Sequence, residues 1–382
     1  MIYLDNSATT KPYESVLQTF LQVNEHYYAN PASIHQAGVE AHELLSRARE
    51  QVASILNTEE KQIIFTSGGT ESNNFALHGV AKSSTHKGKH IIVSEIEHPS
   101  VLEAAKRLIA EGFDVEYLRV DEKGKLSIDQ LKRIIRKDTI LVSVMHVNNE
   151  MGAISPICEM AQIIHENSRA VFHVDAVQSF GKIPLAFDGE NGPDILTVSG
   201  HKIHGLKGSG IIAFRKQLNV HPFIVGGGQE YGLRSGTVAV PLAVSFAKAA
   251  RLAVEKIQVM QEQFKKWNSE LRSYLTQYGE EIFILSPEDA ANHILSFSVK
   301  GLKGEILINA LQKEDILVST SSACSSKQTK DSHVVEAMKV APQYKKGVIR
   351  MSFGAMTTDQ DIEAFKAGFK QVMNELKGEV TR

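Results

Sequence analysis

Five apolar segments of the sequence are each followed by polar residues that could take part in chemistry. In order along the chain, these residues are Gly69 and Thr70, then His98, then Asn148, then Asp175 and Gln178, and finally Ser199, His201 and Lys202. Ligands of open α/β sheets bind at the carboxyl ends of the strands. If the apolar segments are strands of one such sheet, a hydroxyl, an imidazole, a carboxylate and an amine meet at one edge. The sequence therefore predicts a binding site there.

The residue types of Lys202 and Asp175 suit amine chemistry on a flat cofactor. Most lysines are solvated surface residues, but Lys202 stands between an expected buried strand and a glycine-bearing loop. Partial desolvation lowers the pKa of a lysine and frees its amine for Schiff-base chemistry. A carboxylate at the end of a buried strand, such as Asp175, needs a partner. A protonated pyridine nitrogen, as in pyridoxal phosphate, is a suitable one. His98 fits either a structural hydrogen-bonding role or a ring that lies over such a cofactor.

The turn Gly68-Gly69-Thr70 predicts a small anion site. It enters a helix, and backbone N–H groups at a helix N-terminus bind anions, with the Thr70 hydroxyl as a further donor. The alternative is a simple turn, which is the commoner use of two glycines. The spacing matches neither a dinucleotide fingerprint nor a P-loop, so a lone phosphate fits better than NAD or ATP. A second glycine-rich segment, 226–237, ends at Thr237 and is either another anion-binding loop or a connector.

Cys324 has the surroundings of a reactive thiol. From residue 319 to residue 332 the only non-polar side chains are Ala323 and Cys324 itself, so this loop has little to bury and is expected to be mobile. An exposed cysteine with Lys327 nearby favours the thiolate. Cys158, the other cysteine, lies in an amphipathic segment and is interpreted as structural.

Composition excludes several classes of protein. The 382 residues are 42% hydrophobic and 23% charged with a net charge of −2, which argues against a disordered chain or a nucleic-acid binder. Two cysteines exclude a disulfide scaffold. His201 and His204 lack a third ligand at a familiar spacing, so no metal site is predicted. No apolar run has the length of about 20 residues that a membrane span needs. With no secretory signal at the start, we expect a cytoplasmic protein.

The elements that would position these residues belong to an α/β fold. Seven apolar segments between residues 60 and 215 alternate with helix-like stretches, a pattern that predicts a mostly parallel seven-stranded sheet with helices on both faces. A long helical pattern follows from 242 to 278, and then a looser α+β order. We therefore expect an N-terminal arm over 1–14 packed with a small domain, a large domain over 15–255, and a small C-terminal domain over 256–382 that carries the Cys324 loop.

Taken together, these motifs resemble the cysteine desulfurases of the NifS/IscS-like group, within the class-V aminotransferase family of pyridoxal-phosphate enzymes. The resemblance runs through nearly the whole chain. It rests on YLDNSATT, NPAS, FTSGGTESNN, the His98 turn, HVNNEMG, HVDAVQS, SGHKIHGLKG, GGGQEYGLRSGT, the Cys324 loop and VIRMSFG. It implies the fold of the type-I pyridoxal-phosphate enzymes.

The resemblance also implies a role for each matching residue. Lys202 matches the lysine that binds pyridoxal 5′-phosphate covalently, Asp175 the partner of its pyridine nitrogen, Gln178 a donor to its phenolic oxygen, and His98 the stacking histidine that is also an acid/base. Gly69, Thr70, Ser199 and His201 match phosphate-binding positions, and Thr237 matches a phosphate contact from the other subunit of a homodimer. Asn148, at a cofactor and substrate position, and Arg350 match residues that hold the substrate carboxylate. Cys324 matches the nucleophile that becomes a persulfide.

The implied reaction removes sulfur from L-cysteine, gives L-alanine, and leaves a persulfide on Cys324 for an acceptor protein. That acceptor is an iron–sulfur scaffold or a tRNA-thiolating enzyme. Ser321 stands where the family usually has a glycine, and the chain ends soon after the last helix, at Arg382. The alternatives are a selenocysteine lyase or another aminotransferase-like enzyme, and a non-catalytic protein that kept the fold. A thiol at Cys324 argues against an aminotransferase, which needs none.

Overall fold

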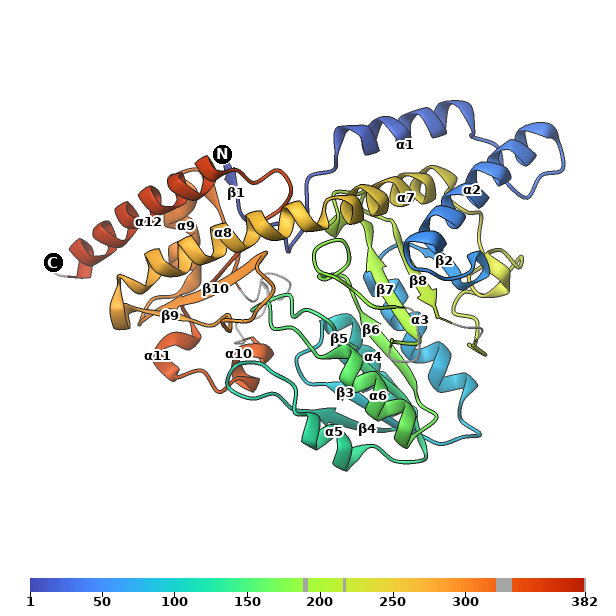
Figure 1. The fold of residues 1–382 in the computed structure, drawn as a ribbon, viewed down its shortest axis with the longest axis horizontal. Coiled ribbons are helices and arrows are strands. Elements are labelled where there is room, and N and C mark those ends of the chain that lie inside the picture. Colours follow the sequence, from blue (N-terminus) through green and yellow to red (C-terminus); the bar gives the residue numbers. More distant parts are fainter. Residues whose placement is uncertain (188–191, 216–217, 321–331, 381–382) are drawn as a thin grey trace.

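The structure is a computed structural model that describes residues 1–187, 192–215, 218–320 and 332–380. Its two main parts are a seven-stranded sheet and a three-stranded sheet, each with its own helices (Figure 1). The helix α8 (Ile257–Thr276) runs along the second part directly after α7 (Val240–Glu255), which packs on the first. The long helical pattern is therefore two helices that meet at Lys256.

The seven apolar segments of the sequence form the large sheet. They are β2 (Ile63–Thr66), β3 (His90–Ser94), β4 (Asp114–Leu118), β5 (Thr139–Met145), β6 (Val171–Asp175), β7 (Ile195–Ser199) and β8 (Gly210–Phe214), in the spatial order β2-β8-β7-β6-β5-β3-β4. Neighbouring strands are parallel except at β8, which is antiparallel to both β2 and β7. The predicted α/β fold class with a mostly parallel sheet is confirmed.

Helices cover both faces of this sheet because its strands are apolar on both sides. On one face, α3 (Gly69–Ser83) and α4 (Pro99–Ala110) pack in a core with alternate strand residues such as Ile64. On the other face, Ile63 and Phe65 belong to a core that also contains residues of α1 (Glu14–His26), α2 (Gln36–Ile55), α5 (Ile128–Ile134), α6 (Ile157–Asn167) and α7. This two-sided burial explains why the strands read as continuous apolar runs.

The second part is built on an antiparallel sheet in the order β12-β10-β9. Its strands are β9 (Ile282–Ile284), β10 (Ile294–Val299) and β12 (Val348–Ser352), and its helices are α8, α9 (Gly304–Lys313), α10 (His333–Ala337), α11 (Pro342–Lys345) and α12 (Asp359–Val380). Trp267, Phe297 and Phe369 are fully buried in its core. The N-terminal strand β1 (Ile2–Tyr3) pairs with β11 (Ile316–Leu317), so the chain starts in this part and then crosses to the other.

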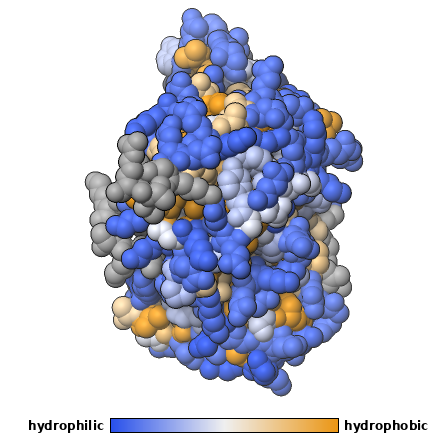
Figure 2. All heavy atoms as spheres, turned by 90° about the vertical axis from the view of Figure 1, so that its left-hand side faces the viewer, coloured by the Kyte–Doolittle hydropathy of each residue, from blue (hydrophilic) through white to orange (hydrophobic). Residues whose placement is uncertain are grey.

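The surface of the molecule is uneven in hydropathy. The side of the molecule that lies at the left of Figure 1 presents mainly hydrophilic residues, with apolar residues in small separate groups (Figure 2). Large exposed apolar side chains include Tyr28 and Ile34, between and near α1 and α2, Val225 and Tyr231 in the segment after β8, and Val259 of α8. None of the described helices combines the length and the apolar composition that a transmembrane helix requires.

Candidate active site

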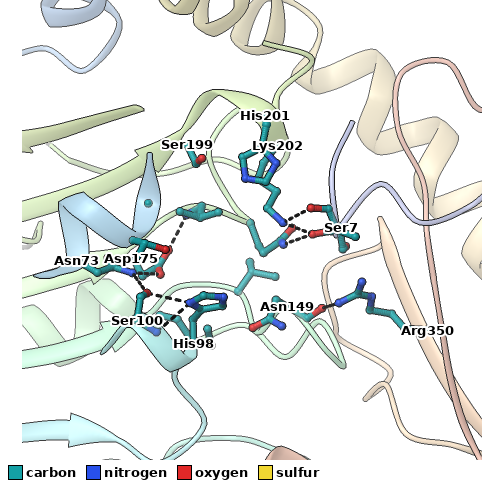
Figure 3. A pocket seen from close by; sticks show the side chains of 17 residues that line it. Ser7, Asn73, His98, Ser100, Asn149, Asp175, Ser199, His201, Lys202 and Arg350 are labelled. Atoms are coloured by element: carbon teal, nitrogen blue, oxygen red, sulfur yellow. Dashed lines mark hydrogen bonds between the residues drawn. The ribbon is translucent and has the colours of Figure 1, made fainter. Parts of the chain in front are cut away.

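A cavity of about 280 Å³ lies at the carboxyl ends of the central strands of the large sheet, beside β12 of the small one. Nine of the residues singled out in the sequence line it: Gly69, Thr70, His98, Asp175, Gln178, Ser199, His201, Lys202 and Arg350. Figure 3 shows the labelled side chains converging from both sheets and from the N-terminal arm. Apart from Arg350, which comes from the small sheet, these residues lie at one edge of the large sheet, where the sequence predicts them.

The amine of Lys202 is held by the N-terminal arm. Lys202 ends the short helix η2 (Gly200–Lys202) that follows β7, and its Nζ donates hydrogen bonds to the carbonyl oxygens of Ser7 and Ala8, the latter at 2.8 Å. The backbone N–H of Thr10 donates to the carbonyl of His201 at 2.8 Å. The arm therefore crosses the cavity, and it lines it with Ser7 and Ala8.

Asp175 ends β6 and is oriented by two donors. Its Oδ2 accepts a hydrogen bond from Asn73 Nδ2 at 2.7 Å, and its Oδ1 accepts one from the backbone N–H of Val177 at 2.9 Å. Asn73 lies one helical turn after Gly69 in α3, and its Nδ2 also donates to Ser100 Oγ at 2.9 Å. With these bonds the carboxylate is fixed at the cavity wall, and its spare lone pairs can accept from a bound group.

His98 presents a neutral ring to the cavity. It is the residue before α4, and its Nδ1 accepts from the backbone N–H of Ser100 at 3.1 Å, which places the ring proton on Nε2. Burial lowers the pKa of His98, while the nearby Asp175 opposes the shift and Lys202 adds to it. A neutral imidazole with one fixed edge can stack on a flat ligand.

An anion-binding end adjoins this cavity. A second hollow of about 440 Å³ shares Gly69, Thr70, Ser199 and His201 with the first and is also lined by Lys207. The α3 N-terminus points its free N–H groups there. Burial and the nearby lysine charges lower the pKa of His201 to about 4, so its ring is neutral and can serve as a hydrogen-bonding group.

The turn before α3 requires glycine. Gly68 has φ +143°, which side chains rarely adopt. A Cβ on Gly69 would lie 2.9 Å from Val177 Cγ2, and one on Gly210 of β8 would lie 2.6 Å from Gly68 Cα. The absence of these side chains lets the turn approach β8 and the residues that follow β6 closely.

Gln178 and Lys182 form a buried pair beside the amine. Gln178 Nε2 donates to the Ser7 carbonyl at 2.9 Å, and Lys182 Nζ donates to Gln178 Oε1 at 3.1 Å. Two amines, those of Lys182 and Lys202, thus lie at the two ends of a chain of hydrogen bonds that meets at Ser7. Burial, together with the charges of Lys202 and Arg350, lowers the pKa of Lys182 to about 7.

Arg350 of β12 brings a guanidinium group to the cavity from the small sheet. Its Nη1 donates to the Asn149 carbonyl at 2.9 Å and its Nη2 donates to Asp5 Oδ1 at 2.8 Å. The structure does not bring the Asn148 side chain to the cavity. Asn148 is fully buried, with its Nδ2 donating to the Ile96 carbonyl at 3.0 Å and its Oδ1 accepting from the Glu150 N–H at 2.9 Å, and the next residue, Asn149, lines the cavity instead.

Two further predicted residues are not in the cavity of this chain. Thr237 is exposed and does not line the cavity. Cys324 lies outside the described residues, as does Ser321. Among the described residues there is no group of three His, Cys, Asp or Glu side chains that could hold a metal ion.

Comparison with protein families gives a match over residues 2–365 to the family described as aminotransferase class-V. The chain belongs to this family. Among its relatives, a cysteine desulfurase IscS of Dictyoglomus turgidum is 39% identical, and the match covers 98% of this chain and 95% of that protein. Among solved structures, a NifS-like protein matches with a TM-score of 0.92 and 37% identity over 98% of this chain and 99% of the other. The structure described as SspA in complex with cysteine matches with a TM-score of 0.81 and 31% identity over 92% and 99% of the two chains.

Class-V aminotransferases use pyridoxal 5′-phosphate, and the residues of the cavity fit it. Asn73 Oδ1 and Ser7 Oγ are buried at the cavity and have no hydrogen-bond partner among the described residues, so polar atoms are left for a ligand. The groups that line the cavity are arranged as the cofactor requires. An anion-binding helix N-terminus lies at one end, the Asp175 carboxylate and the His98 imidazole line the middle, and the Lys202 amine lies beside the N-terminal arm. Gly69, Thr70, Ser199 and His201 would hold the phosphate, Asp175 the ring nitrogen, and Lys202 the aldehyde carbon.

Five further residues that line the cavity were not predicted from the sequence: Ser7, Ala8, Asn73, Ser100 and Asn149. A signal existed for Asn73, because residues four apart on a helix share a face and Gly69 was already singled out. None existed for Ser7 and Ala8, which act through backbone carbonyl oxygens.

Proposed function

We propose that this protein is a pyridoxal-phosphate-dependent cysteine desulfurase, which takes sulfur from L-cysteine, releases L-alanine and holds the sulfur as a persulfide on Cys324. The observation that carries the proposal is the convergence of Lys202, Asp175, His98 and Arg350 on one cavity. An amine that binds the cofactor, a carboxylate for its ring nitrogen, an imidazole for its face and a guanidinium for the substrate carboxylate are what an amino-acid substrate needs. The names of the relatives add the sulfur chemistry.

In the reaction, pyridoxal phosphate supplies an electron sink for the bonds broken at the substrate carbon atoms. Arg350 binds the α-carboxylate of L-cysteine and thereby fixes the direction of the Cα–H bond. With the cofactor and substrate bound, the Lys202 amine would take the Cα proton as a general base. The Ser7 and Ala8 carbonyl oxygens, which accept from Lys202 Nζ, are placed to hold the resulting ammonium group.

Sulfur then moves to the thiol of this chain. The Cys324 thiolate attacks the substrate sulfur, so an S–S bond forms while the substrate Cβ–S bond breaks and its electron pair passes to carbon. Two protons complete the product at Cβ and Cα, and L-alanine leaves. Formation of the persulfide oxidises the two sulfur atoms by two electrons in total, and the substrate Cβ is reduced by two electrons as its C–S bond becomes a C–H bond, so no external oxidant is needed.

Cys324→Ser separates the two halves of this chemistry. We expect the variant to bind pyridoxal phosphate and keep the imine absorption band, since Lys202 is intact, but to lose sulfide and alanine release from L-cysteine. In the unchanged protein, mass analysis after incubation with ³⁴S-labelled L-cysteine should find one added sulfur on the peptide that contains Cys324. Sulfide release at the full rate by Cys324→Ser would refute the proposal.

The unit that carries out this reaction is, in our proposal, a homodimer with shared sites. Thr237 is exposed and absent from the cavity of its own chain, which suits a residue that serves the phosphate end of a partner's cavity. Tyr28, Ile34 and Val225 leave 82%, 99% and 77% of their surface exposed, and association with a second chain could cover such apolar side chains.

Hybrid dimers test this arrangement. Lys202→Ala and Thr237→Ala chains, each inactive or weakened alone, are mixed and allowed to exchange subunits. If sites are shared, a hybrid dimer has one site free of both changes, and activity should rise above that of either parent. Hybrid activity equal to the mean of the parents would contradict shared sites.

The acceptor of the sulfur is proposed to be another protein, either a scaffold for iron–sulfur cluster assembly or an enzyme that thiolates tRNA. The proposal is supported by the mitochondrial and archaeal cysteine desulfurases among the relatives. To distinguish the two kinds of acceptor, purified candidates are incubated with the ³⁵S-persulfide form of this protein. A scaffold should take up the label on a cysteine, whereas a thiolating enzyme with ATP should transfer the label to tRNA. Retention of all label on Cys324 with every acceptor would contradict both.

A further inference from the structure

Arg350 has a charged partner of its own before any substrate is bound. Its side chain is 4% exposed, its Nη2 donates to Asp5 Oδ1 at 2.8 Å, and its Nη1 donates to the Asn149 carbonyl at 2.9 Å. Its Nε is buried and has no hydrogen-bond partner among the described residues. A guanidinium group has five N–H donors. Two are used, so three remain for a carboxylate without displacing Asp5.

Asp5 stands beside this arginine but outside the cavity. Arg350 lines the cavity and Asp5 does not. The backbone of Asp5 is itself fixed, because it forms a bridge with Ser352 of β12 and its carbonyl accepts from the Tyr3 hydroxyl at 3.1 Å. Burial raises the pKa of Asp5, and the Arg350 charge opposes this shift. Asp5 is thus a rigidly held carboxylate whose charged partner, among the described residues, is Arg350.

The same arm also holds the amine of the site. Two residues after Asp5, the Ser7 carbonyl accepts from both Lys202 and Gln178. The distance between the guanidinium, which binds the substrate carboxylate, and the Lys202 amine, which takes the Cα proton, is therefore set in part by a short length of one chain. Asp5 fastens one end of that length to Arg350.

We propose that Asp5 is a positioning residue that holds the Arg350 guanidinium in the orientation that binds the substrate α-carboxylate. The proposal rests on the proposed function, in which Arg350 binds that carboxylate. A free arginine side chain must lose rotamer freedom when it binds, whereas a guanidinium already fixed at Nη1 and Nη2 loses little, so binding is tighter. The specific consequence is discrimination: Asp5 improves binding of molecules that have an α-carboxylate and does nothing for amines that lack one.

The opposite effect is the physical alternative. If Asp5 competed with the substrate carboxylate for Arg350, removing its charge would strengthen carboxylate binding. The unpartnered Nε and the position of Asp5 outside the cavity favour positioning over competition. The two effects have opposite signs, which makes the choice testable.

The test uses the holoprotein and two ligands, L-alanine and ethylamine, which differ by the carboxylate alone. Their dissociation constants are measured from the change in cofactor absorbance at equilibrium, which requires no turnover. We expect Asp5→Ala to lower the affinity ratio of L-alanine to ethylamine by about tenfold, with ethylamine affinity within about twofold of the unchanged protein. Asp5→Asn keeps an acceptor for Nη2 and should recover part of the ratio. Asp359→Asn, which removes the partner of Lys266 on the surface, is the matched control and should leave the ratio unchanged.

Each outcome has one meaning. A ratio that is unchanged or raised in both Asp5 variants overturns the inference while leaving the proposed function intact. Equal loss of affinity for both ligands also overturns it, since that would be a general structural effect. If the unchanged protein itself fails to prefer L-alanine, Arg350 is not a carboxylate site and the proposed function is at fault. Should Asp5→Ala fail to fold, Asp5→Asn alone decides, with an expected loss of about threefold in the ratio.

Discussion

Lys182→Met is expected to make the folded chain more stable at neutral pH, and the gain should shrink as the pH rises. Lys182 is 8% exposed, and its Nζ has one acceptor among the described residues, the Gln178 amide oxygen. The charged groups that influence it, Lys202 and Arg350, are of the same sign, and burial is the main cause that lowers its pKa to about 7. Methionine has a similar length and no proton to lose.

The size of the effect follows from the protons bound in each state. An unfolded lysine keeps its proton up to a pKa of about 10.4, whereas folded Lys182 releases it near pH 7. Between these values the unfolded chain holds one more proton, so the free energy of unfolding rises with pH by about 1.4 kcal/mol per unit. From pH 7 to pH 9 this amounts to about 2 kcal/mol, after allowing for the half-titrated folded group at pH 7. The free energy of unfolding of Lys182→Met lacks this pH-dependent contribution.

The measurement is denaturant unfolding of the cofactor-free protein at pH 7 and pH 9, at one fixed protein concentration. The stability difference between Lys182→Met and the unchanged protein should be about 2 kcal/mol larger at pH 7. Lys248→Met, which removes a partly buried lysine whose amine donates to Thr19 Oγ1 at 2.8 Å, controls for the loss of a lysine in general. The same stability difference at both pH values would show that folded Lys182 keeps its proton, and would refute the reasoning.

Two further predictions concern the packing around the site. Glu230→Gln should lower the free energy of unfolding by about 3–5 kcal/mol, because it leaves Arg49 buried beside a neutral amide. Arg49→Met combined with Glu230→Gln should recover part of this loss in the same denaturant unfolding assay. Equal stability of the single and double variants would contradict this prediction. Gly210→Ala should weaken pyridoxal phosphate binding about tenfold in equilibrium dialysis, because the added Cβ would lie 2.6 Å from Gly68 Cα and displace the turn before α3. Unchanged affinity would show that this turn can move without weakening cofactor binding.

The sheet and most of the site could be predicted from the sequence for physical reasons. Strands buried on both faces are continuous apolar runs, so β3, β5 and β7 were visible without any alignment. Parallel strands place their carboxyl ends together, which is why Asp175 and Lys202 could be assigned to one edge. Arg350 was identified by the family resemblance alone, since it comes from the other sheet.

The features of the site that the sequence did not predict depend on the direction of side chains and on backbone atoms. Asn148 and Asn149 are adjacent and identical in type, and the turn after β5 decides which one faces the cavity: Asn148 Oδ1 caps the N–H groups of Glu150 and Met151, which turns its side chain inward. No residue type signals this choice. The burial of Lys182 could not be predicted either, because nothing in the sequence indicates which lysine is buried.

The N-terminal arm explains why the site can be assembled from two separate sheets. Lys202 follows a strand of the large sheet and Arg350 lies in the small one, and each sheet has its own main core, although a smaller cluster joins the two parts. The arm is a further link, and it contacts both side chains directly: β1 pairs with β11 beside the small sheet, Asp5 binds Arg350, and two residues later the Ser7 carbonyl accepts from Lys202. The arm therefore helps to set the distance between Arg350 and Lys202, and a change in its length between residues 5 and 7 should weaken substrate binding.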